Sequence, residues 1–376
     1  MKIPFLITAT ALLLSGCNNT TQVTNDNSEV SPKGEVLGEV STDDLSPLKT
    51  EEVFLKNKNP FGKDIDLKGR QIVGDTAIFS VKETELLIKG EQLIMKNLTN
   101  PVLYFFSFPE LRLQKTTGRR GQAPDEFMFP TLVPSNTEGA VGYLFEPSLH
   151  KLYKIDQNGA LERLEKPFLE KKSDDNYGPS MELANIGADD FMYVTDSKTG
   201  KSIFRITRDT TEEKEVVSLS LNAARKSPFA YIGSFAVNPR KNRMVYAYKY
   251  FKIIKFMDLE AKEIKTVNFE RDDFKDETAY KVNGLDQNVT HYWGACAGDK
   301  YVYFLYSGRT PTEVMKEANK GDYYIFVEQY DWNGNPVKRY KLDQWGYFTV
   351  DEAHNKLYIV SANHDDPFFE FEMSSN

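Results

Sequence analysis

Four histidines and two cysteines are the residues of this sequence that could most readily ligate a metal or act as a nucleophile or base. None of the histidines, at positions 150, 291, 354 and 364, has a zinc-like spacing to another histidine or a cysteine. The two aspartates after His364 indicate a solvated turn rather than a metal corner. Cys296 stands in a small-residue run, which is typical of a buried small hydrophobic residue. No Gly-x-Ser-x-Gly nucleophile elbow is present. The sequence therefore predicts no catalytic residue, no metal site and no cofactor.

A basic loop and an aromatic residue are weaker candidates for binding. Arg119 and Arg120 lie in a glycine-rich loop, where they could hold an anion. We favour the alternative that this loop is a simple turn between blades, in which the arginines pair with Glu126 rather than with an anion. Trp293 could stack on a sugar or clamp a peptide, although core packing is the more common role for such a residue. Arg119, Arg120, Glu126 and Trp293 are thus the candidate binding residues.

The charge balance limits the kind of partner. The formal net charge is -8, and acidic and basic residues are mixed along the chain. Binding to nucleic acid needs clustered Lys and Arg, so we expect no nucleic-acid partner.

The N-terminus has the features of an export signal. Lys2 precedes an apolar run over residues 3–14 that is too short to span a bilayer. The run ends in Leu14-Ser15-Gly16-Cys17, which resembles the lipobox of bacterial lipoproteins, where the cysteine is lipidated and becomes the first residue. An ordinary signal peptide that contains a cysteine is the alternative. We predict a signal peptide over residues 1–16, a lipid on Cys17 that anchors the chain to a membrane, and a flexible polar tether over residues 17–50.

From about residue 52 onward, pairs of alternating apolar runs recur, each pair joined by a short turn. The pairs 152–164 and 325–340 turn at Asn-Gly, which is a strong hairpin signal. Weaker copies lie at 102–115, 203–217 and 253–269. Most of these copies are about 50 residues apart, a period that is typical of propeller blades. A sandwich seldom shows so many near-periodic copies, and a β-helix has shorter repeats.

Two irregularities refine this prediction. An insertion over residues 310–321 reads as a helix, because Thr310 can cap it, Pro311 suits its first position and Glu313 completes a capping box. The last repeat has only three strands, at 347–350, 356–360 and 367–373, which would leave an unpaired edge. We expect residues 52–55 to supply the missing strand. The predicted fold is therefore all-β, a six-bladed β-propeller over residues 51–376 whose last blade is closed by an N-terminal strand.

Two stretches resemble a known family. Residues 118–127 resemble a GxGPGEF-type loop, with Ala123 and Asp125 in place of two glycines. Residues 330–337, with 348–352 and 356–358, resemble the final blades of the TolB-like six-bladed β-propeller lipoproteins of Bacteroidetes. The resemblance implies the fold and a place in the cell envelope, and it implies no catalytic residues. In the presumed hosts an acidic run near the lipidated cysteine marks export to the surface. None follows Cys17, so we expect an outer-membrane anchor that faces the periplasm.

Two classes of function remain from the sequence. The first is a non-catalytic binding or scaffold propeller that holds a protein or glycan partner in the envelope. The second is a propeller enzyme, lactonase-like or glycan-cleaving, with a site at the axis. The innermost strands are expected at 139–142, 234–237, 294–297 and 347–350, and their residues are mostly apolar or small. This composition favours the binding module.

Overall fold

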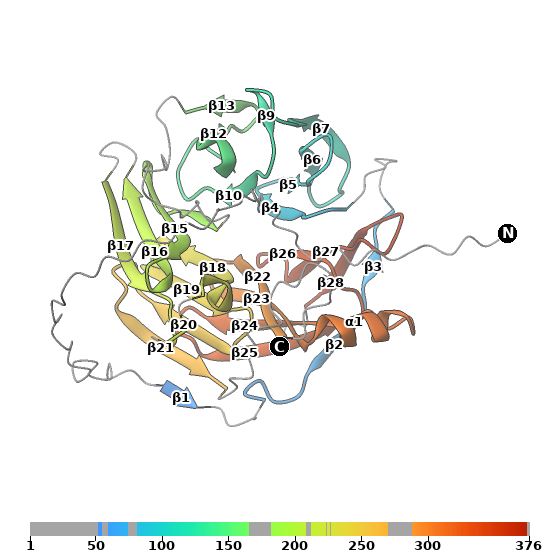
Figure 1. Cartoon of the computed structure of the whole chain (residues 1–376). Coiled ribbons are helices and arrows are strands. Elements are labelled where there is room, and N and C mark those ends of the chain that lie inside the picture. Colours follow the sequence, from blue (N-terminus) through green and yellow to red (C-terminus); the bar gives the residue numbers. More distant parts are fainter. Residues whose placement is uncertain are drawn as a thin grey trace, which may run out of the picture.

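The computed structural model describes residues 52–54, 59–73, 81–164, 182–207, 212–222, 224–225, 227–269 and 288–373. The predicted signal peptide, Cys17 and the tether lie outside these ranges. In the described part, the strands form six large sheets around a common axis (Figure 1). This arrangement confirms the predicted six-bladed β-propeller.

Each sheet is one blade, and its strands follow one another from the axis outward. Blade one has β4 (Glu85–Lys89), β5 (Gln92–Lys96), β6 (Leu103–Ser107) and β7 (Leu113–Thr117). Blade two has β10 (Thr131–Pro134), β11 (Gly142–Glu146), β12 (Lys151–Ile155) and β13 (Leu161–Arg163). Blade three has β14 (Leu183–Asn185), β15 (Asp190–Ser197), β16 (Gly200–Thr207) and β17 (Glu212–Ser218). Blade four has β18 (Gly233–Asn238), β19 (Arg243–Tyr248), β20 (Ile253–Met257) and β21 (Glu263–Asn268). Blade five has β22 (Thr290–Ala297), β23 (Tyr301–Arg309), β24 (Ile325–Asp331) and β25 (Pro336–Leu342). Blade six has β26 (Tyr347–Asp351), β27 (Lys356–Val360) and β28 (Phe368–Glu372), and its outer strand is β3 (Arg70–Gln71).

The innermost strands close the ring. Each of β4, β10, β14, β18, β22 and β26 contacts the next, and β26 contacts β4. The prediction for blade two was wrong, because its innermost strand is β10 and residue 142 begins the second strand. A proline normally argues against a central strand, and Pro134 ends β10. It is tolerated there because β10 is the inner edge of its sheet, where one side of the strand needs no hydrogen-bond partner.

The Asn-Gly hairpins form as predicted. In the β12–β13 turn, Asp156 Oδ1 accepts backbone hydrogen bonds from Asn158 (2.9 Å) and Ala160 (2.7 Å), and Gly159 has a φ of +69°. Asp331 caps the β24–β25 turn in the same way, with bonds from the second and fourth residues after it. A preceding aspartate and a left-handed glycine therefore fix both turns.

The N-terminal strand that closes blade six is not the predicted one. β1 (Glu52–Phe54) pairs in parallel with β21 on the outer edge of blade four, and β2 (Ile65–Leu67) pairs in parallel with β25 of blade five. Of the three N-terminal strands that the structure describes, β3 alone reaches blade six, where Arg70 lies opposite Glu370 and Gln71 opposite Phe369. We name residues 59–71 the N-terminal strap. The strap reaches blade six only after it passes blade five, so the segment around 52–55 is too early in the chain to close the ring.

Aromatic side chains fill the spaces between blades. At the junction where the ring closes, Phe106 packs on Phe368 and Phe108 packs on Tyr358, with ring centroids 5.2 Å apart in both pairs. Edge-to-face contacts of this kind stabilise the packing beyond the burial of apolar area. The first and last blades are thus joined by aromatic packing.

The predicted helix is present as α1 (Pro311–Ala318), between β23 and β24. Thr310 Oγ1 accepts a hydrogen bond from the Glu313 N–H (3.2 Å), and the Glu313 carboxylate accepts one from the Thr310 N–H (2.8 Å). These reciprocal bonds confirm the capping box. No helix in the described ranges is long and apolar enough to cross a membrane.

Candidate functional site

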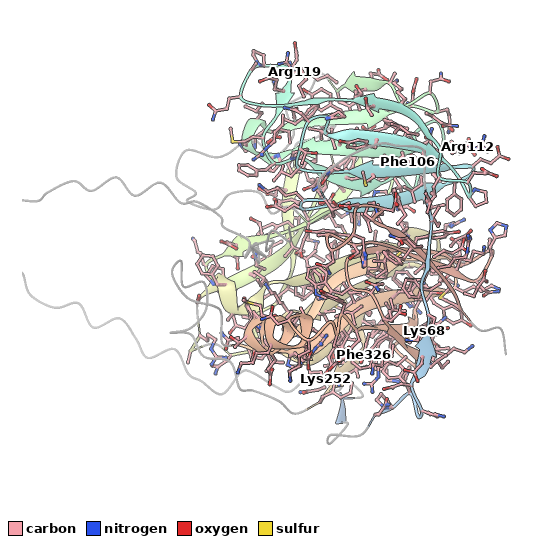
Figure 2. All side chains as sticks on the ribbon, turned by 90° about the vertical axis from the view of Figure 1, so that its right-hand side faces the viewer. Lys68, Phe106, Arg112, Arg119, Lys252 and Phe326 are labelled. Atoms are coloured by element: carbon pink, nitrogen blue, oxygen red, sulfur yellow. The ribbon has the colours of Figure 1, made fainter. Side chains whose placement is uncertain are left out.

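The two elaborated connections lie on the same face of the ring. The innermost strands all start on one face, which we name the entry face, and it also carries the connections between second and third strands. The loop over residues 118–130 leads into β10, and α1 connects the second and third strands of blade five, so both belong to the entry face. Figure 2 shows Arg119 and the orange helix toward one side of the molecule, and Arg112 of the β6–β7 turn toward the other.

The basic loop is organised by Glu126. Within it, β8 (Arg119–Arg120) pairs in parallel with β9 (Glu126–Phe127). The Glu126 carboxylate accepts a hydrogen bond from the Ala123 N–H (3.1 Å) and lies 3.7 Å from Arg119 Nε. The Arg120 N–H donates to Asn100 Oδ1 (2.5 Å). The Arg119 side chain remains 83% exposed, so an exposed basic tip stands on a loop that a carboxylate holds in shape.

Helix α1 is fixed to blade five by Arg309, a residue that the sequence reasoning missed. Arg309 is only 8% exposed, and its guanidinium pairs with Glu317 of α1. It also donates to the Tyr324 carbonyl (2.6 Å) and lies 3.9 Å from the centre of the Tyr324 ring. A charged side chain can be buried at low cost only where it is paired in this way. Arg309 thus contacts both α1 and Tyr324, which follows the helix in the chain. These contacts give α1 a defined position on the entry face.

Trp293 belongs to a second cluster, which also includes Trp345 and Tyr347 and which we name the aromatic junction. The Trp293 ring lies edge-to-face with Trp345, with centroids 5.6 Å apart and an interplanar angle of 87°. The Tyr347 ring is 6.4 Å away. All three side chains are half-buried. Trp293 and Trp345 pack where blade five meets blade six, and the Tyr347 side chain also reaches the backbone of Glu83 and Thr84 before β4. The basic loop instead follows blade one, so the four candidate binding residues do not form one site.

Tyr292, the neighbour of Trp293, belongs to the core. Its hydroxyl donates to the fully buried Glu328 carboxylate (3.0 Å), as does the hydroxyl of Tyr330 (3.2 Å). Burial raises the pKa of Glu328. Arg339 lies 3.8 Å from Glu328 and makes two hydrogen bonds to Asp64 of the N-terminal strap (2.8 and 3.0 Å). A buried acid with a raised pKa often marks an active site. In this protein, Arg339 lies between this carboxylate and Asp64, and it connects the strap to blade five.

The other chemically reactive groups stand apart from one another. Burial raises the pKa of the Cys296 thiol to about 11, which leaves little of the nucleophilic thiolate at neutral pH. His354 pairs with Asp351 (2.6 Å) in the β26–β27 turn, on the face opposite the entry face. Burial raises the pKa of Glu182, just before β14, to about 7, and Lys201 opposes this shift. Within the described ranges, no three His, Cys, Asp or Glu side chains are placed to hold a metal ion.

Comparison with solved structures finds similar chains from Bacteroides species. A member of the DUF4221 family from Bacteroides vulgatus aligns with a TM-score of 0.49 and 12% identity, over 82% of this chain and 95% of that one. A putative exported protein from Bacteroides fragilis aligns with a TM-score of 0.50 and 9% identity, over the same shares of each chain. An auxiliary nutrient binding protein from Bacteroides thetaiotaomicron aligns with a TM-score of 0.46 and 9% identity, over 78% of this chain and 69% of that one.

Comparison by sequence shows the family. A search of curated proteins finds no match to this chain. The family model described as a TolB-like 6-blade propeller matches residues 79–353, a span that runs from blade one into blade six and includes both elaborated connections. The chain therefore belongs to the TolB-like six-bladed propeller family.

Proposed function

We propose that this protein is a non-catalytic binding propeller of the cell envelope that holds a protein or glycan partner on its entry face. The observation that carries the proposal is the common placement of the basic loop and α1. Both elaborations are fixed to the rigid ring, the loop by the bond from the Arg120 N–H to Asn100 of blade one and the helix by Arg309. Loops that a rigid scaffold positions on one face are where binding surfaces are usually built. The fold alone does not specify a function, so the proposal rests on this face.

The envelope location belongs to the same proposal. We propose that Cys17 carries a lipid and that the tether over residues 17–50 connects it to the ring. The anchor would lie in the outer membrane and face the periplasm. A tethered ring would meet partners that are themselves fixed in the envelope, and confinement raises the effective concentration of each for the other.

Site-specific photo-cross-linking in cells tests which face binds. A photoreactive residue is placed at Arg119 or Lys316 on the entry face, and at Arg112 on the opposite face, since all three side chains are exposed. We expect a discrete adduct from the two entry-face positions and none from Arg112. Equal adducts from both faces would contradict the proposal.

A charge reversal gives a matched test. Arg120→Glu should weaken capture of the partner, and Arg112→Glu should leave capture unchanged, because it lies on the opposite face. Both variants should keep the unfolding midpoint, since both side chains are exposed. Turnover of a lactone or glycoside by the purified protein, abolished by changing one carboxylate near the axis, would replace this proposal with the enzyme alternative.

A further inference from the structure

Two buried polar atoms at the inner end of blade five lack hydrogen bonds. Among the described residues, neither Trp293 Nε1 nor Ser307 Oγ has a hydrogen-bond partner. Ser307 is only 7% exposed. An indole N–H that is shielded from water normally finds an acceptor, because an unpaired donor costs free energy. These two atoms therefore indicate a place where a further polar group would be stabilised.

Both side chains point toward blade six. Trp293 and Leu305 pack in the cluster between blades five and six, whereas Tyr306 packs in the cluster between blades four and five. Side chains alternate along a strand, so Ser307 returns to the side of Leu305. Strand β23 remains regular up to Tyr306, which pairs with Phe326 of β24. An indole donor and a hydroxyl thus share one interface.

The rings of Trp345 and Tyr347 are aromatic neighbours of Trp293. Tyr347 begins β26, and Trp345 stands in the connection that leads into it, so both lie at the entry face. The interplanar angle between Trp345 and Trp293 is 87°, which gives two apolar surfaces at right angles. Trp345 lies outside any strand and is half-buried. A ligand that reaches Trp293 Nε1 requires the Trp345 side chain to turn, and interface rotamer changes are common on binding.

The groups at the aromatic junction suit a ligand that has both an apolar face and hydroxyl groups. Trp293 Nε1 can only donate a hydrogen bond, whereas Ser307 Oγ can donate or accept one. A sugar ring offers hydroxyl oxygens to both groups and an apolar face to an aromatic ring.

We propose that the aromatic junction is a subsite for one ring of a saccharide. The apolar face of the sugar would stack on Trp345, and a sugar oxygen would accept a hydrogen bond from Trp293 Nε1. Ser307 would bond to a neighbouring hydroxyl. This assignment rests on the proposed binding function, and it names the chemical class of the ligand at one place on the entry face.

Tryptophan fluorescence tests the assignment directly. The chain has 3 tryptophans, and two of them are in the aromatic junction. The third, Trp332, is 3% exposed and donates to the Gly298 carbonyl (3.1 Å). Full-length protein in detergent is titrated with cellohexaose, maltoheptaose and mannohexaose as probes. At least one probe should change the emission saturably, and the Trp332→Phe variant should respond as the unaltered protein does.

Two conservative variants separate binding from folding. Trp293→Phe keeps an aromatic ring and removes the N–H, so it should weaken binding of the active probe about tenfold, as expected for one lost hydrogen bond in a desolvated site. Trp345→Ala should abolish binding. Their unfolding midpoints are measured alongside, and isothermal titration calorimetry replaces fluorescence where tryptophans are lost.

Several outcomes would overturn the saccharide subsite. One is the absence of binding by all three neutral probes, which would leave a buried water as the partner of Trp293 Nε1. A second is equal affinity of the folded Trp293→Phe variant. A third is unchanged affinity of the folded Trp345→Ala variant. If cross-linking at Arg119 and Lys316 still succeeds in any of these cases, the proposed function stands without the subsite.

Discussion

The N-terminal strap should contribute measurably to the stability of the propeller through Leu67. This side chain is 8% exposed and packs in the cluster between blades five and six, with Tyr340, Leu342 and Phe371 among its members. Replacing a buried leucine with alanine removes apolar burial and leaves a cavity, at a cost of about 2–5 kcal/mol. Leu67 lies at the edge of its sheet, where the strap can shift inward to fill part of the space. We therefore expect Leu67→Ala to lower the free energy of unfolding by about 2 kcal/mol, the lower end of that range.

Urea unfolding monitored by circular dichroism measures this loss. Asp66→Ala is the matched control, because Asp66 is the preceding residue of β2 and its side chain is exposed. The control should stay within about 0.5 kcal/mol of the unaltered protein, as is usual for exposed positions. An unchanged midpoint for Leu67→Ala would refute the reasoning, because the strap would then add no buried surface. An equal loss in both variants would refute it as well, since the effect would not come from burial.

Three further predictions concern the anchor, a carboxyl group and a turn. Cys17→Ser should abolish labelling by a fatty-acid probe and release the protein from membranes; continued labelling would exclude the lipid anchor. Glu182 has a pKa raised to about 7 in the folded protein, so its contribution to stability is largest below its unfolded pKa and is lost as the pH rises through 7. The stability gain of Glu182→Gln over the unaltered protein should therefore grow between about pH 4.5 and 7 in urea titrations, and a constant difference would contradict the shift. Gly159→Ala should destabilise more than Gly90→Ala: both glycines have positive φ, but an added Cβ at Gly159 would lie 2.8 Å from the Phe105 ring, whereas Gly90 has open space. Equal thermal midpoints for the two variants would show that only the backbone matters.

Local chemistry explains what could be predicted from the sequence. The two Asn-Gly turns, the Thr310 capping box and the short alternating strands depend on residues within a few positions of each other, and each is present in the structure. The period of about 50 residues follows because every blade solves the same packing problem with the same number of strands. The class of fold, the number of blades and the position of the helix could therefore be predicted from the sequence.

Only part of the candidate site could be predicted from the sequence. Trp293 was recognised as an aromatic that could bind, but its partner Trp345 is separated from it by more than one blade's length of chain and shares no motif with it. Arg309 has no sequence signal except that a basic residue precedes a capping box. The placement of the basic loop and α1 on one face depends on the direction of the strands around the ring, which no local pattern records.

The closure of the ring depends on contacts that no local pattern encodes. Arg70 and Gln71 of β3 show no apolar alternation, because an edge strand of two exposed residues needs backbone pairing and an ion pair rather than burial. Arg339 and Asp64 are 275 positions apart, and their double hydrogen bond forms only once the strap crosses blade five. The repeated unit and its turns, in contrast, are encoded locally, since they follow from short-range sterics and hydrogen bonding. The order in which the N-terminal segment meets the blades is set by contacts between distant parts of the chain, and these exist only in the folded ring.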